Sequence, residues 1–179
     1  MPSLAGLDKD GRVIYLNSFT KSVAPSLRIS FMVLPDDLRD HFLRDYPFYT
    51  CPVSLIGQVA LHRFMSKGLF ERHLNRMKII YRTKRDQLIQ SLRESSLHDK
   101  LRIVGAEAGL HFLLEFADGV SETELVESAR SMSVRVHSLQ EYFLDPLPHP
   151  PTIVIGYSGL ETAAMKKAIS ILETAWKWL

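Results

Sequence analysis

The chain has 179 residues, of which 46% are hydrophobic and 23% are charged. This length and balance fit one ordinary globular domain, with or without an added segment, and argue against disorder or a fibrous repeat. A formal charge of +2 gives no bulk basic excess of the kind that a phosphate-tracking protein carries, and no apolar run approaches the ~20 residues that span a bilayer.

The lone cysteine, Cys51, cannot form an internal disulfide or a thiolate metal site, and it is expected to be a buried or half-buried thiol. This cysteine usage favours a reducing cytoplasm.

The histidines show no paired spacing with a carboxylate, so no metal site is expected. The first residues, 1–11, lack the apolar core of a secretion signal.

Two short apolar runs open the chain, at 13–16 and 27–34, and both are typical of β-strands. A polar connection separates them. Because the runs are apolar on both faces, they indicate interior strands of a covered sheet. Two strands alone would expose unpaired edges, so cover from further chain or from a partner is expected.

Helical periodicity follows over 38–96. A first helix ends before Pro47, and a second begins near Ser54 and ends or bends at Gly68. The third is expected to run for about 25 residues, or ~38 Å at ~1.5 Å per residue, which suits a strut between two bodies. Its polar face is basic, which marks a solvated or interdomain face more often than a nucleic-acid contact.

The final third alternates strands and helices. Strands are predicted at 101–104, 110–116, 134–136 and 152–157, helices at 121–132 and 161–179, and a proline-rich loop at 145–151. Ser121 and Glu124 have the spacing of a capping box. Four strands and two helices indicate a small two-layer α/β unit. Of the two terminal tryptophans, Trp176 and Trp178, one is expected to pack inside the unit.

Lys21 carries the chemistry that the sequence suggests most strongly. It follows the first strand, with Ser18 three residues before it and Arg28 seven residues after it. A lysine that is desolvated near other cations loses its proton and can form an imine with an aldehyde. The Ser18 hydroxyl and the Arg28 guanidinium can hold a phosphate beside it. Pyridoxal phosphate has both groups, although the spacing alone also fits a solvated lysine in a polar loop.

The longer string around this lysine is VIYLNSFTKSVAPSLRISFMVLP. It resembles the lysine segment of the fold-type I pyridoxal-phosphate enzymes of the aminotransferase class I/II family, which reads roughly G/N-S-F-S-K and then L-R-x-G-Y. The resemblance implies that Lys21 is the Schiff-base lysine and that Ser18, Thr20 and Arg28 bind the cofactor, with Ser18 and Arg28 on its phosphate. Thr20 replaces the usual serine, and Ser30 the usual glycine.

The helical string QVALHRFMSKGLFERHLNRMKIIYRTKRDQL resembles the interdomain helix of the MocR/GabR type of GntR-family transcriptional regulator. Such regulators join a winged-helix DNA-binding domain to an aminotransferase-like domain. The strings AGLHFLLEF and IVIGYSGL resemble the small domain of the same family. The residues that fit the helix pattern are Gln58, Ala60, Leu61, Phe64, Gly68, His73, Arg76, Met77, Tyr81 and Arg85.

The resemblance implies an α/β chain that is the C-terminal part of a fold-type I transferase. Residues 1–50 would be a remnant of the large domain with the strands that flank the lysine turn, 51–97 the interdomain helices, and 98–179 the small domain. The winged helix and the upstream half of the cofactor site, including the acid that pairs with the pyridine nitrogen, are expected to be missing. Pyridoxal phosphate should therefore bind weakly or not at all to this chain alone.

Three functions stay open. The first is an effector module that senses an amine or amino acid through imine exchange. The second is a fragment of a true aminotransferase that moves an amino group to a 2-oxo acid, although no arginine near the last strand is placed to hold a substrate carboxylate. The third is a truncated chain that acts only in folding or dimerisation. A homodimer is expected, with no membrane contact and with DNA contact only through the absent winged helix.

Overall fold

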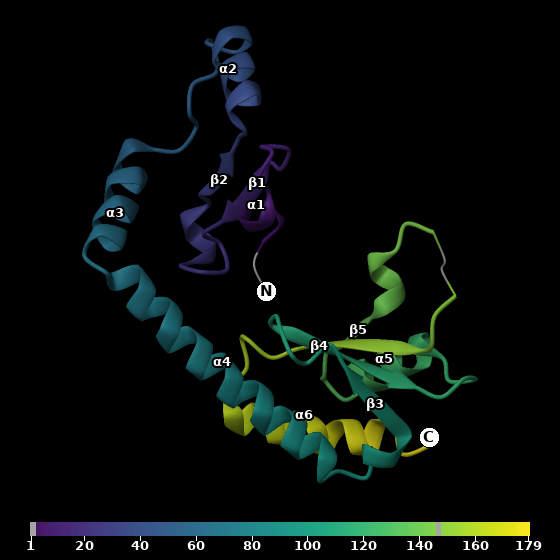
Figure 1. The fold of residues 1–179 in the computed structure, drawn as a ribbon. Helices are drawn as coiled ribbons and strands as arrows, with labels where there is room; N and C mark the ends of the chain where they lie inside the picture. Colours follow the sequence, from purple (N-terminus) through teal and green to yellow (C-terminus); the bar gives the residue numbers. More distant parts are fainter. Residues whose placement is uncertain (1–2, 146–147) are drawn as a thin grey trace. The chain divides into compact units, whose positions relative to one another are not determined.

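The computed structural model describes residues 3–145 and 148–179, which form two compact units, 1–77 and 78–179 (Figure 1). The boundary between the units falls within one long helix, α4. Residues 146–147 of the proline-rich loop lie outside the described residues. The three-part division at 1–50, 51–97 and 98–179 stays a prediction.

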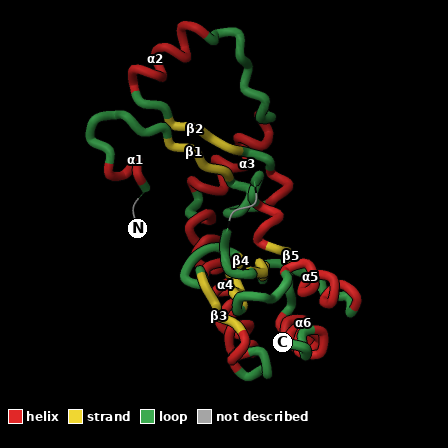
Figure 2. Tube along the Cα trace, turned by 90° about the vertical axis from the view of Figure 1, so that its right-hand side faces the viewer, coloured by secondary structure: helices red, strands yellow, loops and turns green. Residues whose placement is uncertain are grey.

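The first unit consists of an antiparallel hairpin followed by helices. Its elements are α1 (Leu4–Leu7), β1 (Tyr15–Ser18), the 3-10 helix η1 (Pro25–Leu27), β2 (Ser30–Val33), α2 (Asp36–Asp45), α3 (Leu55–Ser66) and the start of α4 (Leu69–Arg93). Figure 2 shows β1 and β2 side by side. Both predicted strands are present. β1 has the length of its apolar run but begins two residues later, and β2 is shorter than its run because Pro25 favours the helical turn that delays it.

The apolar side chains of this hairpin are largely exposed within the described chain. Leu16 is 69% exposed, and Val33 is 53% exposed. Ile29, just before β2, is the one apolar side chain of the first unit that is buried among the described residues. The covered interior strands expected from the sequence are therefore not covered by the described part of the chain.

Local capping fixes where the helices of the first unit begin and end. The Ser54 hydroxyl accepts the N–H of Gly57 at 3.1 Å and begins α3. Gly68 separates α3 from α4 with a φ of +66°, in the left-handed region that glycine adopts without a steric penalty. The 25-residue length of α4 agrees with the sequence-based prediction.

Cys51 lies in the connection between α2 and α3, and it is exposed rather than buried or half-buried. The expectation of a packed thiol is wrong within the described chain, because the connection around Cys51 is exposed except at Val53 and offers little surface to cover the thiol.

The second unit is a two-layer structure with one antiparallel sheet. The strands β3 (Leu101–Val104), β4 (His111–Phe116), β5 (His137–Ser138) and β6 (Thr152–Gly156) have the order β3-β4-β6-β5. The helices are α5 (Glu122–Ser131), α6 (Thr162–Ala175) and the C-terminal half of α4. Figure 1 shows α6 beside the end of α4, both along the sheet.

The short strand β5 begins three residues later than the strand predicted at 134–136. The N–H of Val134 donates to the carbonyl of Ala129 at 3.0 Å, so it caps α5 instead of joining the sheet. Ser133 has a φ of +63°, which completes this helix-ending turn. The apolar pattern of 134–136 therefore reflects burial of Val136 and partial burial of Val134 without strand pairing.

Trp176 anchors the core between the helices and the sheet. It is fully buried, its Nε1–H donates to the carbonyl of Leu125 at 3.0 Å, and its ring meets Phe116 edge-on with centroids 5.4 Å apart. Trp178 is 48% exposed. The expectation that one of the two tryptophans packs is confirmed.

A second group that links the elements of this unit is the Glu122 carboxylate at the start of α5. It accepts the N–H of Thr152 at 2.6 Å and the hydroxyl of Ser138, and His149 Nδ1 lies 3.5 Å away. These bonds join the helix to β5 and β6. A carboxylate is also favourable at a helix N-terminus.

We expect Trp176→Ala to lower the free energy of unfolding of the second unit by about 3–5 kcal/mol, because it removes a large buried side chain and leaves the Leu125 carbonyl without its donor. Urea unfolding followed by circular dichroism measures this. The control is Trp178→Ala, which should change the free energy by no more than about 0.5 kcal/mol. Equal losses in the two variants would contradict this packing.

Candidate functional site

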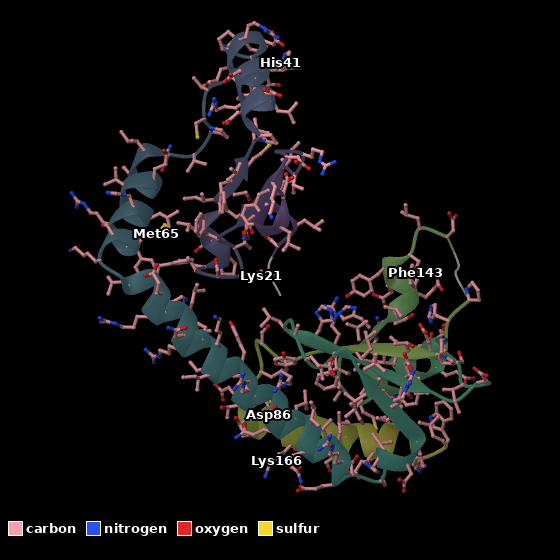
Figure 3. All side chains as sticks on the ribbon, in the orientation of Figure 1. Lys21, His41, Met65, Asp86, Phe143 and Lys166 are labelled. Atoms are coloured by element: carbon pink, nitrogen blue, oxygen red, sulfur yellow. The ribbon has the colours of Figure 1, made fainter. Side chains whose placement is uncertain are left out.

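The β1–β2 loop presents Lys21 on a hydrogen-bonded turn. The N–H of Phe19 donates to the carbonyl of Ile29 at 2.9 Å and closes the base of the loop. The N–H of Val23 donates to the carbonyl of Phe19 at 2.8 Å, so Lys21 lies in the middle of a closed turn. Figure 3 shows Lys21 at this loop, and its side chain is exposed.

Phe19 fixes the turn to the rest of the first unit. Its ring lies 5.4 Å from the ring of Phe31 and meets Phe70 edge-on at 5.9 Å, measured between centroids. Phe31 belongs to β2 and Phe70 to the first turn of α4. Sequence reasoning did not single out Phe19, although an aromatic residue two positions before the lysine was the available signal.

Arg28 ends the helix η1 in the left-handed region, with a φ of 50° and a ψ of 33°. This conformation costs a non-glycine residue about 1–2 kcal/mol, so the surrounding structure must hold it in place. Because Ser18 pairs with Ser30 in the ladder, the backbone of Arg28 lies at the same end of the hairpin as Ser18.

All four residues predicted to bind the cofactor lie in or next to the loop that runs from Phe19 to Ile29. Lys21 and Arg28 are exposed, and Ser18 and Thr20 are half-buried. Within the described residues, neither cation forms an ion pair with a carboxylate. That their side chains converge on one ligand stays a prediction.

Other candidate groups lie elsewhere. His111 is exposed at the start of β4. In the described parts of the chain, no three His, Cys, Asp or Glu side chains gather as metal ligands would. None of the helices over these residues has the combined length and apolarity needed to cross a membrane.

The fold of the chain matches that of solved aminotransferases. The α-aminoadipate aminotransferase LysN from Thermus thermophilus superposes with a TM-score of 0.85 at 23% identity, over 99% of this chain and 46% of that one. That structure is complexed with N-(5'-phosphopyridoxyl)-L-leucine. The fold is therefore that of the fold-type I pyridoxal-phosphate-dependent transferases, as the sequence predicted.

The family model described as Aminotransferase class I and II matches residues 1–172, and the chain belongs to this family. It is 37% identical over 176 residues to the uncharacterized HTH-type transcriptional regulator YhdI of Bacillus subtilis. This match covers 98% of this chain and 37% of that protein. It is 35% identical to the probable rhizopine catabolism regulatory protein MocR of Rhizobium meliloti, and the match covers 98% of this chain and 35% of that protein. The chain thus spans little more than a third of these relatives, and the predicted resemblance is confirmed.

The residues at the loop fit the chemical groups of pyridoxal phosphate. A primary amine suits its aldehyde, and two hydroxyls with a guanidinium suit its phosphate dianion.

We expect Phe19→Ala to loosen the Lys21 turn, because it removes the aromatic contacts that tie the loop to β2 and α4. Tryptic cleavage after Lys21 should accelerate about tenfold, which corresponds to ~1.4 kcal/mol of lost local stability. The rate is measured by mass spectrometry of timed digests.

The matched control is Phe48→Ala, which removes an exposed phenyl ring from the α2–α3 connection of the same unit. Cleavage after Lys21 should keep its original rate in that variant. An unchanged rate in Phe19→Ala would show that the turn does not depend on this ring.

Proposed function

We propose that this chain is the C-terminal part of the aminotransferase-like effector domain of a MocR-type transcriptional regulator, which binds pyridoxal phosphate and senses an amine or amino acid. The observation that carries the proposal is the 35–37% identity to regulators over 98% of the chain, Lys21 loop included. A true aminotransferase has weaker support, because the likeness to solved enzymes lies under 25% identity.

In this proposal each loop residue has a separate task. Bound pyridoxal phosphate supplies an aldehyde that condenses with a primary amine and a ring that withdraws electrons. Lys21 Nζ provides the amine and holds or releases a proton when a ligand amine competes for the same position. The Arg28 guanidinium and the Ser18 hydroxyl hold the phosphate, and Thr20 adds a second hydroxyl.

We further propose that residues 1–50 belong to the large domain, 51–97 to the interdomain helices and 98–179 to the small domain. The exposed apolar side chains of the hairpin support cover by further chain or by a second copy in a homodimer. The lone, exposed cysteine fits a reducing cytoplasm. DNA recognition would belong to a winged-helix domain outside these residues.

The experiment that tests the cofactor assignment is reductive trapping. The 179-residue chain is incubated briefly with pyridoxal phosphate, reduced with borohydride and digested, and the labelled lysines are quantified by mass spectrometry. We expect Lys21 to be labelled at least fivefold faster than the exposed lysines Lys9 and Lys67, even though the overall affinity is weak.

Two controls make this result specific. Arg28→Ala should abolish the preference for Lys21, because it removes the phosphate contact, whereas Arg12→Ala removes an exposed guanidinium of the same unit and should leave it intact. Pyridoxal without the phosphate should label all three lysines alike. Labelling of Lys21 no faster than that of Lys9 would refute the assignment.

A further inference from the structure

The positive charge of this chain is concentrated in one short segment. Residues 62–85 contain eight of the 22 lysines and arginines and one of the 20 acidic residues, Glu71. The overall charge of +2 conceals this concentration because acidic residues dominate the sequence that follows. The segment covers the end of α3 and most of α4.

Six of these eight cations are exposed, and the four that lie in the first unit form what we call the basic face of α3 and α4. Its members are Arg63, Lys67, Arg72 and Arg76. Figure 3 shows nitrogen-tipped side chains projecting from these two helices. The other two cations have structural partners: Lys84 Nζ donates to the carbonyl of Ser158 at 3.1 Å, and Arg85 donates to the carbonyl of Ala106 at 3.1 Å.

No carboxylate neutralises the basic face over the described ranges, since its four cations are absent from the ion pairs found there. Like charges one helical turn apart, such as Arg72 and Arg76, repel each other and destabilise a helix. Several such cations in succession raise the local potential and attract polyanions.

The spacing of the cations suits a phosphate backbone. Arg72 and Arg76 are separated by ~6 Å of helix at ~1.5 Å per residue. One strand of duplex DNA carries a phosphate about every 3.4 Å along its axis, so this length matches about two phosphates. Arg63 and Lys67 add a second pair of cations one turn apart on α3.

We propose that the basic face binds the phosphate backbone of double-stranded DNA, as a contact separate from any winged helix. The inference rests on the proposed function only in its choice of polyanion, because a regulator holds its effector domain close to DNA. A membrane surface suits α4 less well, because part of its apolar stripe is already packed: Phe70 contacts Phe19 and Phe64, and Leu88 is buried.

The test is fluorescence anisotropy of a labelled duplex of mixed sequence titrated with the 179-residue chain. With about four phosphates neutralised, affinity should fall ~100-fold between ~50 mM and ~200 mM salt. The double variant Arg72→Glu, Arg76→Glu should bind at least tenfold more weakly at the lower salt concentration.

The matched control is Lys166→Glu, Lys167→Glu, which changes the net charge equally at two exposed lysines of α6. It should alter the affinity less than twofold. Circular dichroism establishes that both variants are folded. The titration is done without pyridoxal phosphate, so failure of the cofactor proposal remains distinguishable from failure of this one.

Three results would overturn the proposal. One is the absence of duplex binding at ~50 mM salt, where phosphate contacts are strongest. Another is equal weakening by the two double variants, which would mean that net charge alone attracts the chain to DNA. The third is tighter binding to vesicles of anionic lipid than to duplex, with the same sensitivity to the Arg72 and Arg76 changes.

Discussion

The aromatic contact of Phe19 with Phe31 and Phe70 is the interaction on which the candidate site depends. The backbone bond between Phe19 and Ile29 closes the base of the loop, and the ring adds contacts with β2 and α4. A two-stranded hairpin is marginal in water, so the ring supplies a tertiary contact that the ladder lacks. The position of the Lys21 backbone depends on this packing.

The two units differ sharply in how much apolar surface they bury. The second unit has a continuous core around Phe112, Leu114, Ile153 and Trp176, whereas Ile29 is the single buried apolar side chain among the described residues of the first. Hydrophobic burial is the main favourable contribution to folding. The hairpin unit therefore depends on further surface for its stability, which is what a part of a larger domain requires.

The sequence predicted those elements whose signals are local and periodic. The apolar stripe of α4 and the break at Gly68 defined both helices, and the Lys21 motif identified the family. The sequence failed where a tertiary or capping contact decided the outcome. Val134 caps α5 instead of pairing in the sheet, and Cys51 lies on a connection that the described chain leaves uncovered. Neither the Val134 cap nor the exposure of Cys51 produces a periodic pattern in the sequence.

The placement of the candidate site in the weakly buried unit has a thermodynamic consequence for a sensor. A ligand that binds only the ordered loop stabilises that loop by RT ln(1 + [L]/Kd), which is about 2.7 kcal/mol at a hundredfold excess over Kd. In a well-packed core this increment would change little, since such a region is already ordered. In a hairpin with exposed apolar strands and a left-handed Arg28, the same increment can decide whether the loop is ordered. The proposed effector role would use this increment to couple the order of the Lys21 loop to its occupancy.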